Sequence, residues 1–387
     1  MSDSKIIAPY TEAGIAEAVR EAAEKAAPFE IVSGATKRDY GRPVKAGSVL
    51  DVSALSGIVK YEPEELVLTV RAATPMREIE AALAEKKQML AFEPADWGQL
   101  FGTPAGRATL AGVVATNACG SRRVKAGAVR DSVIGCRFVN GRGEIVKAGG
   151  HVIKNVTGFD LPKLMCGAFG TLGVLTEITV RVSPLPECVA FLSVRGCDAE
   201  AGLRVLREAA AMPVDVSGLA YVPREDTAHV RVEGTPAAVA EKVLLLGQRF
   251  SDRDCVTVEG PRANGLFRGL SDGSDFICDD ADIWRLCVPA TNAAAAVKES
   301  RPRFWYADWA GGLLWLDLPA DEETAARLRA ITARSGGHAT LMRAGADARA
   351  RFAFEPEKPA RADITRAVKA AFDPKRIFNP GRMFEGI

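Results

Sequence analysis

Hydrophobic and polar positions repeat with a helical period near the start of the chain. Residues 11–27 place Ile15, Val19 and several alanines at spacings of three and four, with charged side chains between them. Thr11 is a favourable N-cap and Pro28 follows the last periodic residue, so the pattern predicts an amphipathic helix. A second helix is predicted over residues 75–86, with Pro75 in its first turn.

Short apolar runs rich in β-branched residues predict strands around these helices. The runs are residues 29–33, 49–52, 66–70, 133–140, 144–148 and 178–182. The segment Gly-Arg-Gly separates the runs at 133–140 and 144–148, which predicts a hairpin.

The pattern changes at residues 183–187, Ser-Pro-Leu-Pro-Glu, because two prolines so close together cannot continue a central strand. Beyond this boundary, strand patterns alternate with helix patterns, which predicts a second domain of the α+β class. The strand patterns are 189–194, 228–232 and 313–318, and the helix patterns are 199–211, 236–249 and 322–335. The tryptophan-rich stretch 304–318 is interpreted as core rather than as a partner surface.

Length and charge narrow the class of protein. A chain of 387 residues predicts about two domains, and 50 Lys and Arg against 49 Asp and Glu give no field that would attract nucleic acid or an anionic membrane. The first residues lack the basic start and apolar block of a signal peptide, and no apolar stretch reaches about 18 residues. We therefore expect a soluble, cytoplasmic protein.

Metal and hydrolase signatures are weak. The eight cysteines form no Cys-x-x-Cys pair and the three histidines form no His-Glu-x-x-His pattern, so we expect no metal site. Neither a Walker A motif nor a Rossmann fingerprint occurs. Residues 269–273 match Gly-x-Ser-x-Gly, but their polar, loop-like flanks indicate a chance match in a loop.

Three segments of small residues are more informative. In residues 31–42, IVSGATKRDYGR, a predicted strand leads into amides that could cradle a phosphate, although a plain surface turn is the alternative. Residues 109–120, TLAGVVATNACG, would let an extended ligand lie against the backbone; a tightly packed turn and helix is the alternative. Glycines at 158, 167, 170 and 173 mark a third segment where the backbone turns sharply or something approaches closely. One long ligand with phosphates in its middle explains all three, and FAD fits better than NAD because the Rossmann fingerprint is missing.

The order of these motifs resembles a known family. SGATKRDYG, TLAGVVATNACG, KNVTGFDLPKLMCGAFGTLGVLTE and the terminal FDPKRIFNPGRM are similar to the vanillyl-alcohol-oxidase type of flavoprotein, with its p-cresol-methylhydroxylase-type (PCMH-type) FAD domain. Within it, the chain resembles the FAD-binding E subunits of bacterial glycolate oxidase. The resemblance implies an α+β fold with a two-part FAD-binding domain in residues 1–185, an α+β cap or substrate domain in 186–345, and a segment at 346–387 that packs back on the FAD domain.

The resemblance also implies contacts with FAD. It places the pyrophosphate at one segment, the path from the pyrophosphate to the flavin at a second, the isoalloxazine or its linker at a third, the adenosine half at a fourth, and the polar edge of the flavin at the C-terminal tail. In that order the residues are Ser33, Gly34, Ala35, Thr36 and Lys37; Thr109, Gly112, Thr116, Asn117 and Gly120; Asn155, Thr157, Gly158 and Asp160; Gly170, Thr171, Gly173 and Val174; and Asn379. Some relatives attach FAD through a histidine in the first segment; SGATKRDYG has none, so non-covalent FAD is expected.

The implied activity is oxidation of glycolate, or a related 2-hydroxy acid, to glyoxylate or its counterpart. The implied partners are a second FAD subunit and an iron–sulfur subunit, which could hold the complex at the inner face of the membrane. A self-sufficient FAD dehydrogenase of D-lactate or another 2-hydroxy acid or alcohol is the first alternative, and a scaffold with structural FAD is the second.

Catalytic residues are harder to select. His338, in SGGHATLMR, is the candidate base, and a loop or strand-edge histidine is its alternative interpretation. Arginine suits a substrate carboxylate, but no spacing selects among the available arginines, such as Arg285, Arg343, Arg351 and Arg382.

Overall fold

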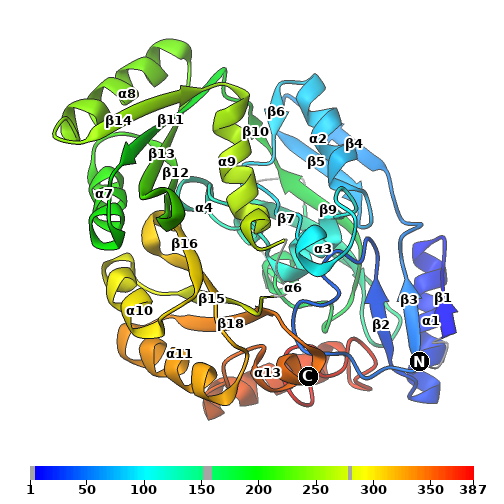
Figure 1. Cartoon of the computed structure of the whole chain (residues 1–387). Helices are drawn as coiled ribbons and strands as arrows, with labels where there is room; N and C mark the ends of the chain where they lie inside the picture. The colour runs from blue at the N-terminus through cyan, green and yellow to red at the C-terminus, as the bar shows by residue number, and fades with distance from the viewer. Residues whose placement is uncertain (1–4, 151–158, 278–280) are drawn as a thin grey trace. The chain divides into compact units, whose positions relative to one another are not determined.

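The computed structural model of the chain describes residues 5–150, 159–277 and 281–387 and divides the chain into two compact units (Figure 1). Unit 1 contains Met1–Ala118, Ala128–Pro184 and Pro356–Ile387; unit 2 contains Cys119–Gly127 and Leu185–Glu355. Both units mix helices and sheets, which confirms the predicted α+β class. Residues 119–127, which we expected within the first domain, lie in unit 2.

Unit 1 holds a five-stranded antiparallel sheet, a three-stranded parallel sheet and a two-stranded ladder among its described residues, in the orders β4-β5-β9-β7-β8, β1-β3-β2 and β10-β6. The strands are β1 (Lys5–Ile7), β2 (Phe29–Val32), β3 (Ser48–Asp51), β4 (Ile58–Glu62), β5 (Val67–Arg71), β6 (Gln88–Met89), β7 (Val133–Val139), β8 (Ile145–Gly149), β9 (Val174–Arg181) and β10 (Ser183–Pro184). The helices are α1 (Glu12–Lys25), α2 (Met76–Glu85), η1 (Gln99–Phe101), α3 (Leu110–Thr116), α5 (Val129–Ser132), α6 (Leu161–Met165) and α13 (Pro359–Phe372).

Local sequence explains α1 and the hairpin. The side chain of Thr11 accepts a hydrogen bond from the amide of Gly14 at 3.0 Å, as expected of an N-cap, and Ile15 and Val19 are fully buried. Strands β7 and β8 pair antiparallel, which confirms the predicted hairpin. Strand β9 begins at Val174, four residues before the predicted run, because its first residues are buried on both faces and carry no alternation.

The C-terminal tail is part of the core of unit 1. The amide of Phe29 donates to Ile377 at 3.0 Å, and the amide of Asn379 donates to the carbonyl of Phe29 at 3.2 Å. Ile377 and Phe378 are fully buried in a cluster with residues of α1 and β3. The tail therefore extends the parallel sheet beside β2.

Unit 2 is built on an eight-stranded antiparallel sheet of order β14-β11-β13-β12-β16-β17-β15-β18. Its strands are β11 (Cys188–Arg195), β12 (Val216–Val222), β13 (Thr227–Gly234), β14 (Asp254–Glu259), β15 (Ile283–Cys287), β16 (Phe304–Asp308), β17 (Leu313–Asp317) and β18 (His338–Arg343). Its helices are α4 (Arg123–Ala126), α7 (Ala199–Ala211), η2 (Pro223–Glu225), α8 (Pro236–Arg249), α9 (Pro261–Asp272), η3 (Ser274–Phe276), η4 (Ala290–Asn292), α10 (Ala293–Ser300), η5 (Trp309–Gly311), α11 (Glu322–Ser335) and α12 (Ala346–Phe352).

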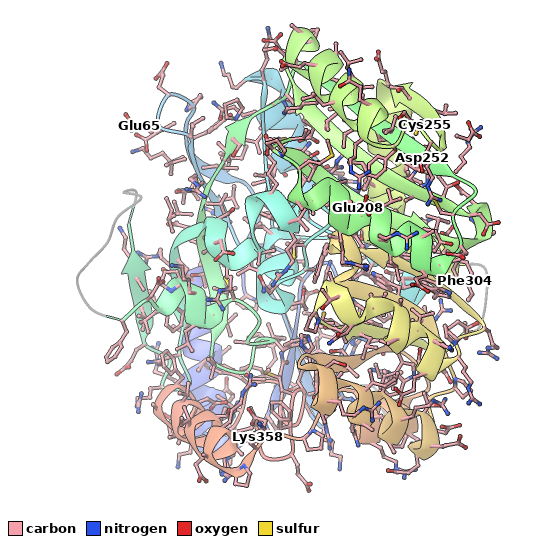
Figure 2. The ribbon with its side chains drawn as sticks, turned by 90° about the vertical axis from the view of Figure 1, so that its left-hand side faces the viewer. Glu65, Glu208, Asp252, Cys255, Phe304 and Lys358 are labelled. Carbon is pink, nitrogen blue, oxygen red and sulfur yellow. The ribbon has the colours of Figure 1, made fainter. Side chains whose placement is uncertain are left out.

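The two faces of this sheet differ in chemistry. Helices α7, α8, α10 and α11 follow one side of it (Figure 1), and apolar side chains at alternate strand positions, such as Leu192, Val230 and Leu316, form the core beneath them. An ion pair between Glu208 of α7, labelled in Figure 2, and Arg249 of α8 links two of these helices. The intervening strand positions point to the other face, which carries polar and aromatic residues.

The Gly-x-Ser-x-Gly match lies in a helix, so our interpretation of its flanks as a loop was wrong. Ser271 is buried in the last turn of α9, and its Oγ donates to the carbonyl of Phe267 at 2.8 Å. The glycines and asparagine of this helix have low helix propensity, which hid it. A buried serine that caps a helical carbonyl has none of the exposure of a hydrolase nucleophile. None of the helices in residues 5–150, 159–277 or 281–387 is both long and apolar enough to cross a bilayer.

Candidate cofactor site

Unit 1 contains a cavity of about 790 Å³, open solvent at its mouth included. Its wall is formed by residues 30–40, by the first turns of α3, by the loop that precedes β9 and by the C-terminal tail. The three predicted motifs of small residues therefore meet the fourth motif, the C-terminal tail, at one place, although more than 340 positions separate the ends of this set in the sequence.

The turn after β2 forms one side of the cavity. Ser33 and Thr109 share a hydrogen bond between their hydroxyl groups at 2.8 Å, which ties this turn to α3. Ala35 has a φ of 59°, and the carbonyl of Ala35 accepts the amide of Arg38 at 3.2 Å, so the chain folds back sharply here. Lys37 is buried: its Nζ donates to the carbonyl of Ala95 at 2.9 Å. The backbone therefore forms a compact turn at the cavity wall, and the predicted contact of its amides with a phosphate stays a prediction.

The two glycines of these motifs do different work. A Cβ on Gly34 would lie 1.8 Å from the backbone oxygen of Arg107, so Gly34 is required for close packing of two segments behind the cavity. A Cβ on Gly112 would meet only the Oγ1 of Thr109, at 3.5 Å, and Gly112 lines the cavity. The space beside Gly112 is therefore a cradle that a side chain would fill, which fits an extended ligand lying against the helix.

The cavity carries a net positive charge, because Lys37, Arg38 and Arg382 line it against a single carboxylate, Glu30. Arg382 Nη2 donates to Glu30 Oε1 at 2.6 Å, and Arg38 Nε donates to Glu30 Oε2 at 2.9 Å. The hydrogen bond that Arg38 donates to Glu30 raises the pKa of Arg38. Cations in excess over carboxylates suit a ligand with a diphosphate. Arg38 lies inside the motif SGATKRDYG and Arg382 inside the motif FDPKRIFNPGRM, and this position is the signal that could have assigned them to the cofactor site.

Asn379 holds the two walls together. Its φ is 41°, its Oδ1 accepts the amide of Ile31 at 2.8 Å, and its Nδ2 donates to the carbonyl of Phe169 at 2.7 Å. Gly170 has a φ of 68°, and a Cβ there would lie 2.7 Å from the same Nδ2. Both ends of the amide thus bond backbone, which gives Asn379 a positioning role at the cavity wall. Its predicted bond to the flavin edge stays a prediction.

The structure brings ten of the predicted cofactor residues to the cavity: Ser33, Ala35, Thr36, Lys37, Thr109, Gly112, Thr116, Gly170, Gly173 and Asn379. The residues of the set described next do not line the cavity. Val174 is fully buried in the core, and Thr171 is buried with its Oγ1 donating to Ala168 at 2.7 Å. Asn117 ends α3, and its Oδ1 accepts the amide of Arg130 at 3.1 Å. Gly120 lies in unit 2, where its carbonyl accepts Trp309 Nε1 at 3.1 Å.

Asp160 is the described member of the predicted isoalloxazine set. It is exposed and caps α6, where its Oδ1 accepts the amide of Lys163 at 3.3 Å. Asn155, Thr157 and Gly158 lie outside the described residues. His338, the candidate base, begins strand β18 of unit 2, pairs in register with Cys287 and is exposed. Its role stays a prediction.

The glycines of the third motif also divide by function. Gly167 and Gly170 have φ of 77° and 68°, a left-handed conformation that favours glycine. A Cβ on Gly173 would lie 2.9 Å from the ring of Phe138, so Gly173 is small because an aromatic side chain packs on it. The left-handed backbone explains Gly167 and Gly170, and aromatic packing explains Gly173, so none of the three requires a ligand contact.

Comparisons with known proteins agree with this geometry. Residues 4–149 match the family model of the FAD binding domain, and residues 344–383 match that of the C-terminal domain of FAD linked oxidases. Among solved structures, alkyldihydroxyacetonephosphate synthase has a TM-score of 0.71 with 16% identity, over 97% of this chain and 75% of that one. Chitooligosaccharide oxidase has a TM-score of 0.66 with 15% identity, over 99% of this chain and 92% of that one. The fold and the cavity define an FAD-linked oxidoreductase.

Curated relatives narrow the family. The chain is 35% identical to glycolate oxidase subunit GlcE of Escherichia coli (strain K12), over 97% of both chains. It is 26% identical to glycolate oxidase subunit GlcD of Bacillus subtilis (strain 168), over 88% of this chain and 80% of that one. The chain belongs to the family of FAD-linked oxidases that includes GlcE.

Proposed function

We propose that the chain is the FAD-binding subunit of a glycolate oxidase complex. It would take part in oxidising glycolate, or a closely related 2-hydroxy acid, to the 2-oxo acid and pass electrons to partner subunits. The observation that carries the proposal is a positively charged cavity, walled in part by small residues, in a chain that aligns with GlcE over 97% of its length. The name of GlcD supports a second glycolate oxidase subunit as one partner. We expect that this subunit also binds FAD and that an iron–sulfur subunit is the further partner.

Bound FAD would supply the acceptor for the hydride that leaves the substrate carbon. The protein would hold it through its own residues. The turn at Ser33–Lys37 and the backbone beside Gly112 would flank the diphosphate, while Arg38 and Arg382 would balance its charge. Phe169 and Tyr40, whose ring centroids lie 5.0 Å apart, would give the cavity an apolar wall against a flat ring.

We infer that FAD is held without a covalent bond. Attachment of a flavin through histidine or cysteine needs such a side chain at the cavity, and neither residue type occurs among the described residues that line it. His338 would remain the group that accepts the hydroxyl proton, if this chain performs the oxidation itself.

The experiment is an anaerobic titration of the flavin in the purified chain with glycolate, first alone and then with its co-expressed partner subunits. Reduction that requires the partners supports the proposed subunit. Reduction of the isolated chain at catalytic rates would favour a self-sufficient dehydrogenase, and a flavin that stays oxidised in both would favour a structural cofactor. His338→Gln, compared with wild type in the same titration, tests the proposed base.

A further inference from the structure

The face of the unit 2 sheet opposite helices α7, α8, α10 and α11 carries a row of aromatic and cationic side chains. Arg285 of β15 pairs in register with Trp315 of β17, and Trp315 pairs with Tyr306 of β16. Residues in register point to the same face of an antiparallel sheet, so these three side chains are neighbours. Arg285 Cζ lies 5.1 Å from the ring centroid of Trp315, and the rings of Trp315 and Tyr306 are stacked with centroids 5.8 Å apart.

Two guanidinium groups meet at one indole beside this row. The Cζ of Arg123 lies 4.7 Å from the ring centroid of Trp309, and the Cζ of Arg285 lies 5.3 Å from it. Arg123, Arg285 and Trp309 are all partly exposed. They come from three places in the sequence, namely the segment 119–127, strand β15 and the turn after β16, so the fold of unit 2 is what brings them together.

Trp309 is held in an unusual conformation. Its φ is 53° and that of Ala310 is 60°, so two consecutive residues other than glycine lie in the left-handed region. The buried Asp308 fixes the turn, because its Oδ1 accepts the amide of Trp309 at 2.7 Å and its Oδ2 accepts Ser121 Oγ at 2.7 Å. Strained backbone of this kind persists where the surroundings determine it and gathers at ligand sites. The indole is thus a fixed platform.

One cation at this platform, Arg123, lacks a carboxylate partner among the described residues. Within the described part of the chain, Arg123 forms no ion pair; its Nη1 donates only to the sulfur of Cys119, at 3.4 Å. Burial raises the pKa of the Cys287 thiol, and the positive charges of Arg285 and Arg123 oppose that rise, so both cations are near one point. Like charges held close together in a partly buried place favour an anion between or beside them.

We propose that Arg123 and Arg285, gathered on Trp309, form a binding site for the carboxylate of a small 2-hydroxy acid. The proposal rests on the proposed function for the choice of a carboxylate, because the planar guanidinium fork matches the two oxygens of that group. It selects Arg285 from the arginines that the sequence left open and adds Arg123, which the sequence did not single out. Arg343, another of them, instead donates to the backbone carbonyls of Ala281 and Phe276, both at 2.9 Å.

The test is a binding titration of the full-length chain with glycolate and with oxalate, followed by tryptophan fluorescence and by calorimetry. We expect saturable binding in the wild type, and an affinity at least about tenfold weaker in Arg123→Gln or Arg285→Gln, the effect of losing one charged hydrogen bond. Trp309→Phe should lose most of the fluorescence change while calorimetry still detects binding. Arg303→Gln is the matched control, because Arg303 is exposed and pairs with Asp317 in the same sheet.

The outcomes separate the alternatives. Equal affinities in Arg123→Gln, Arg285→Gln and Arg303→Gln would overturn the site. Sulfate that binds as tightly as oxalate, without competition from glycolate, would overturn the assignment to a carboxylate. Arg123→Lys keeps the charge without the fork and should bind with intermediate affinity, which keeps the test informative if the Gln variants fold poorly. The titration measures tryptophan fluorescence and heat, not flavin absorbance. Absence of FAD would therefore count against the proposed function without affecting the measured affinity for the carboxylate.

Discussion

Replacement of Lys369 by methionine should destabilise unit 1 and loosen the cavity wall. Lys369 is 1% exposed, and its Nζ donates to Asp373 Oδ2 at 2.8 Å, to the carbonyl of Thr171 at 2.7 Å and to the carbonyl of Phe378 at 3.0 Å. All three ammonium protons are therefore used. Thr171 and Phe378 adjoin Gly170 and Asn379, which line the cavity.

The size of the effect follows from these contacts. Removal of one member of a buried ion pair costs about 3–5 kcal/mol, because the remaining charge is left without its partner. Asp373 keeps hydrogen bonds from the amides of Ile377, at 3.1 Å, and Phe378, at 2.9 Å, which limit the loss. Burial lowers the pKa of Lys369 even though Asp373 favours the charged form, so the pair also carries a desolvation cost. We expect a loss of about 3–5 kcal/mol in the free energy of unfolding.

The assay is urea unfolding of Lys369→Met, with retained FAD measured by absorbance in the same samples. Lys375→Met is the matched control, because Lys375 is exposed on the same segment. The double variant with Asp373→Leu should lose less than the sum of the single losses, as expected when two residues interact directly. A loss in Lys369→Met below about 1 kcal/mol, the range of exposed pairs, would show that the pair does not hold the tail.

Three further predictions concern unit 1. Gly34→Ala should lower the free energy of unfolding by about 1–3 kcal/mol and reduce FAD retention, because its Cβ would lie 1.8 Å from the backbone oxygen of Arg107. Gly47→Ala is the control in a thermal melt, because no atom lies within 4 Å of its added Cβ. Equal melting temperatures of the two variants would contradict the packing argument. Burial raises the pKa of Glu12, but hydrogen bonds from Arg137 and Thr176 outweigh it and lower the pKa below 4.5. The stability that Glu12 contributes is therefore full above pH 4.5 and is lost as the pH falls through the folded-state pKa, so Glu12→Gln should cost about 1–2 kcal/mol at neutral pH; a cost that stays constant through acid unfolding would count against this. Burial raises the pKa of the buried Cys136 and of the half-buried Cys166 to about 12, so mass spectrometry should find neither labelled by a thiol reagent at neutral pH until the protein is unfolded. Labelling of either thiol in the native chain would contradict the raised pKa values.

Periodicity predicted the elements that repeat clearly and missed those that do not. Helices α7, α8 and α11 have the predicted bounds, because each has a capping residue and an amphipathic face. Strand β15 was not predicted. It is only five residues long, and Arg285 at its centre interrupts the apolar run that would indicate a buried strand. Helix α9 was read as a loop because of its glycines.

The site was predictable as a set of segments and less so residue by residue. Motif order indicated which segments meet at the cavity. It could not show that Gly34 packs against Arg107 or that Val174 points into the core, because tertiary packing decides which side of each backbone segment faces the cavity. Lys369 and Asp373 are four residues apart on a helix, a spacing typical of exposed ion pairs. Their burial follows from tertiary packing of the tail, which local sequence does not record.

The most direct measurement is the flavin content of the purified wild-type chain beside that of Gly112→Leu. Leucine favours a helix, and the only atom near the added Cβ is the Oγ1 of Thr109, so the variant should fold while its side chain enters the cavity. If FAD lies against this helix, the wild type should carry flavin that acid precipitation releases, and the variant should carry little while keeping its circular dichroism spectrum. Flavin retained in full by a folded Gly112→Leu, or a wild type that takes up no FAD on reconstitution, would contradict this placement.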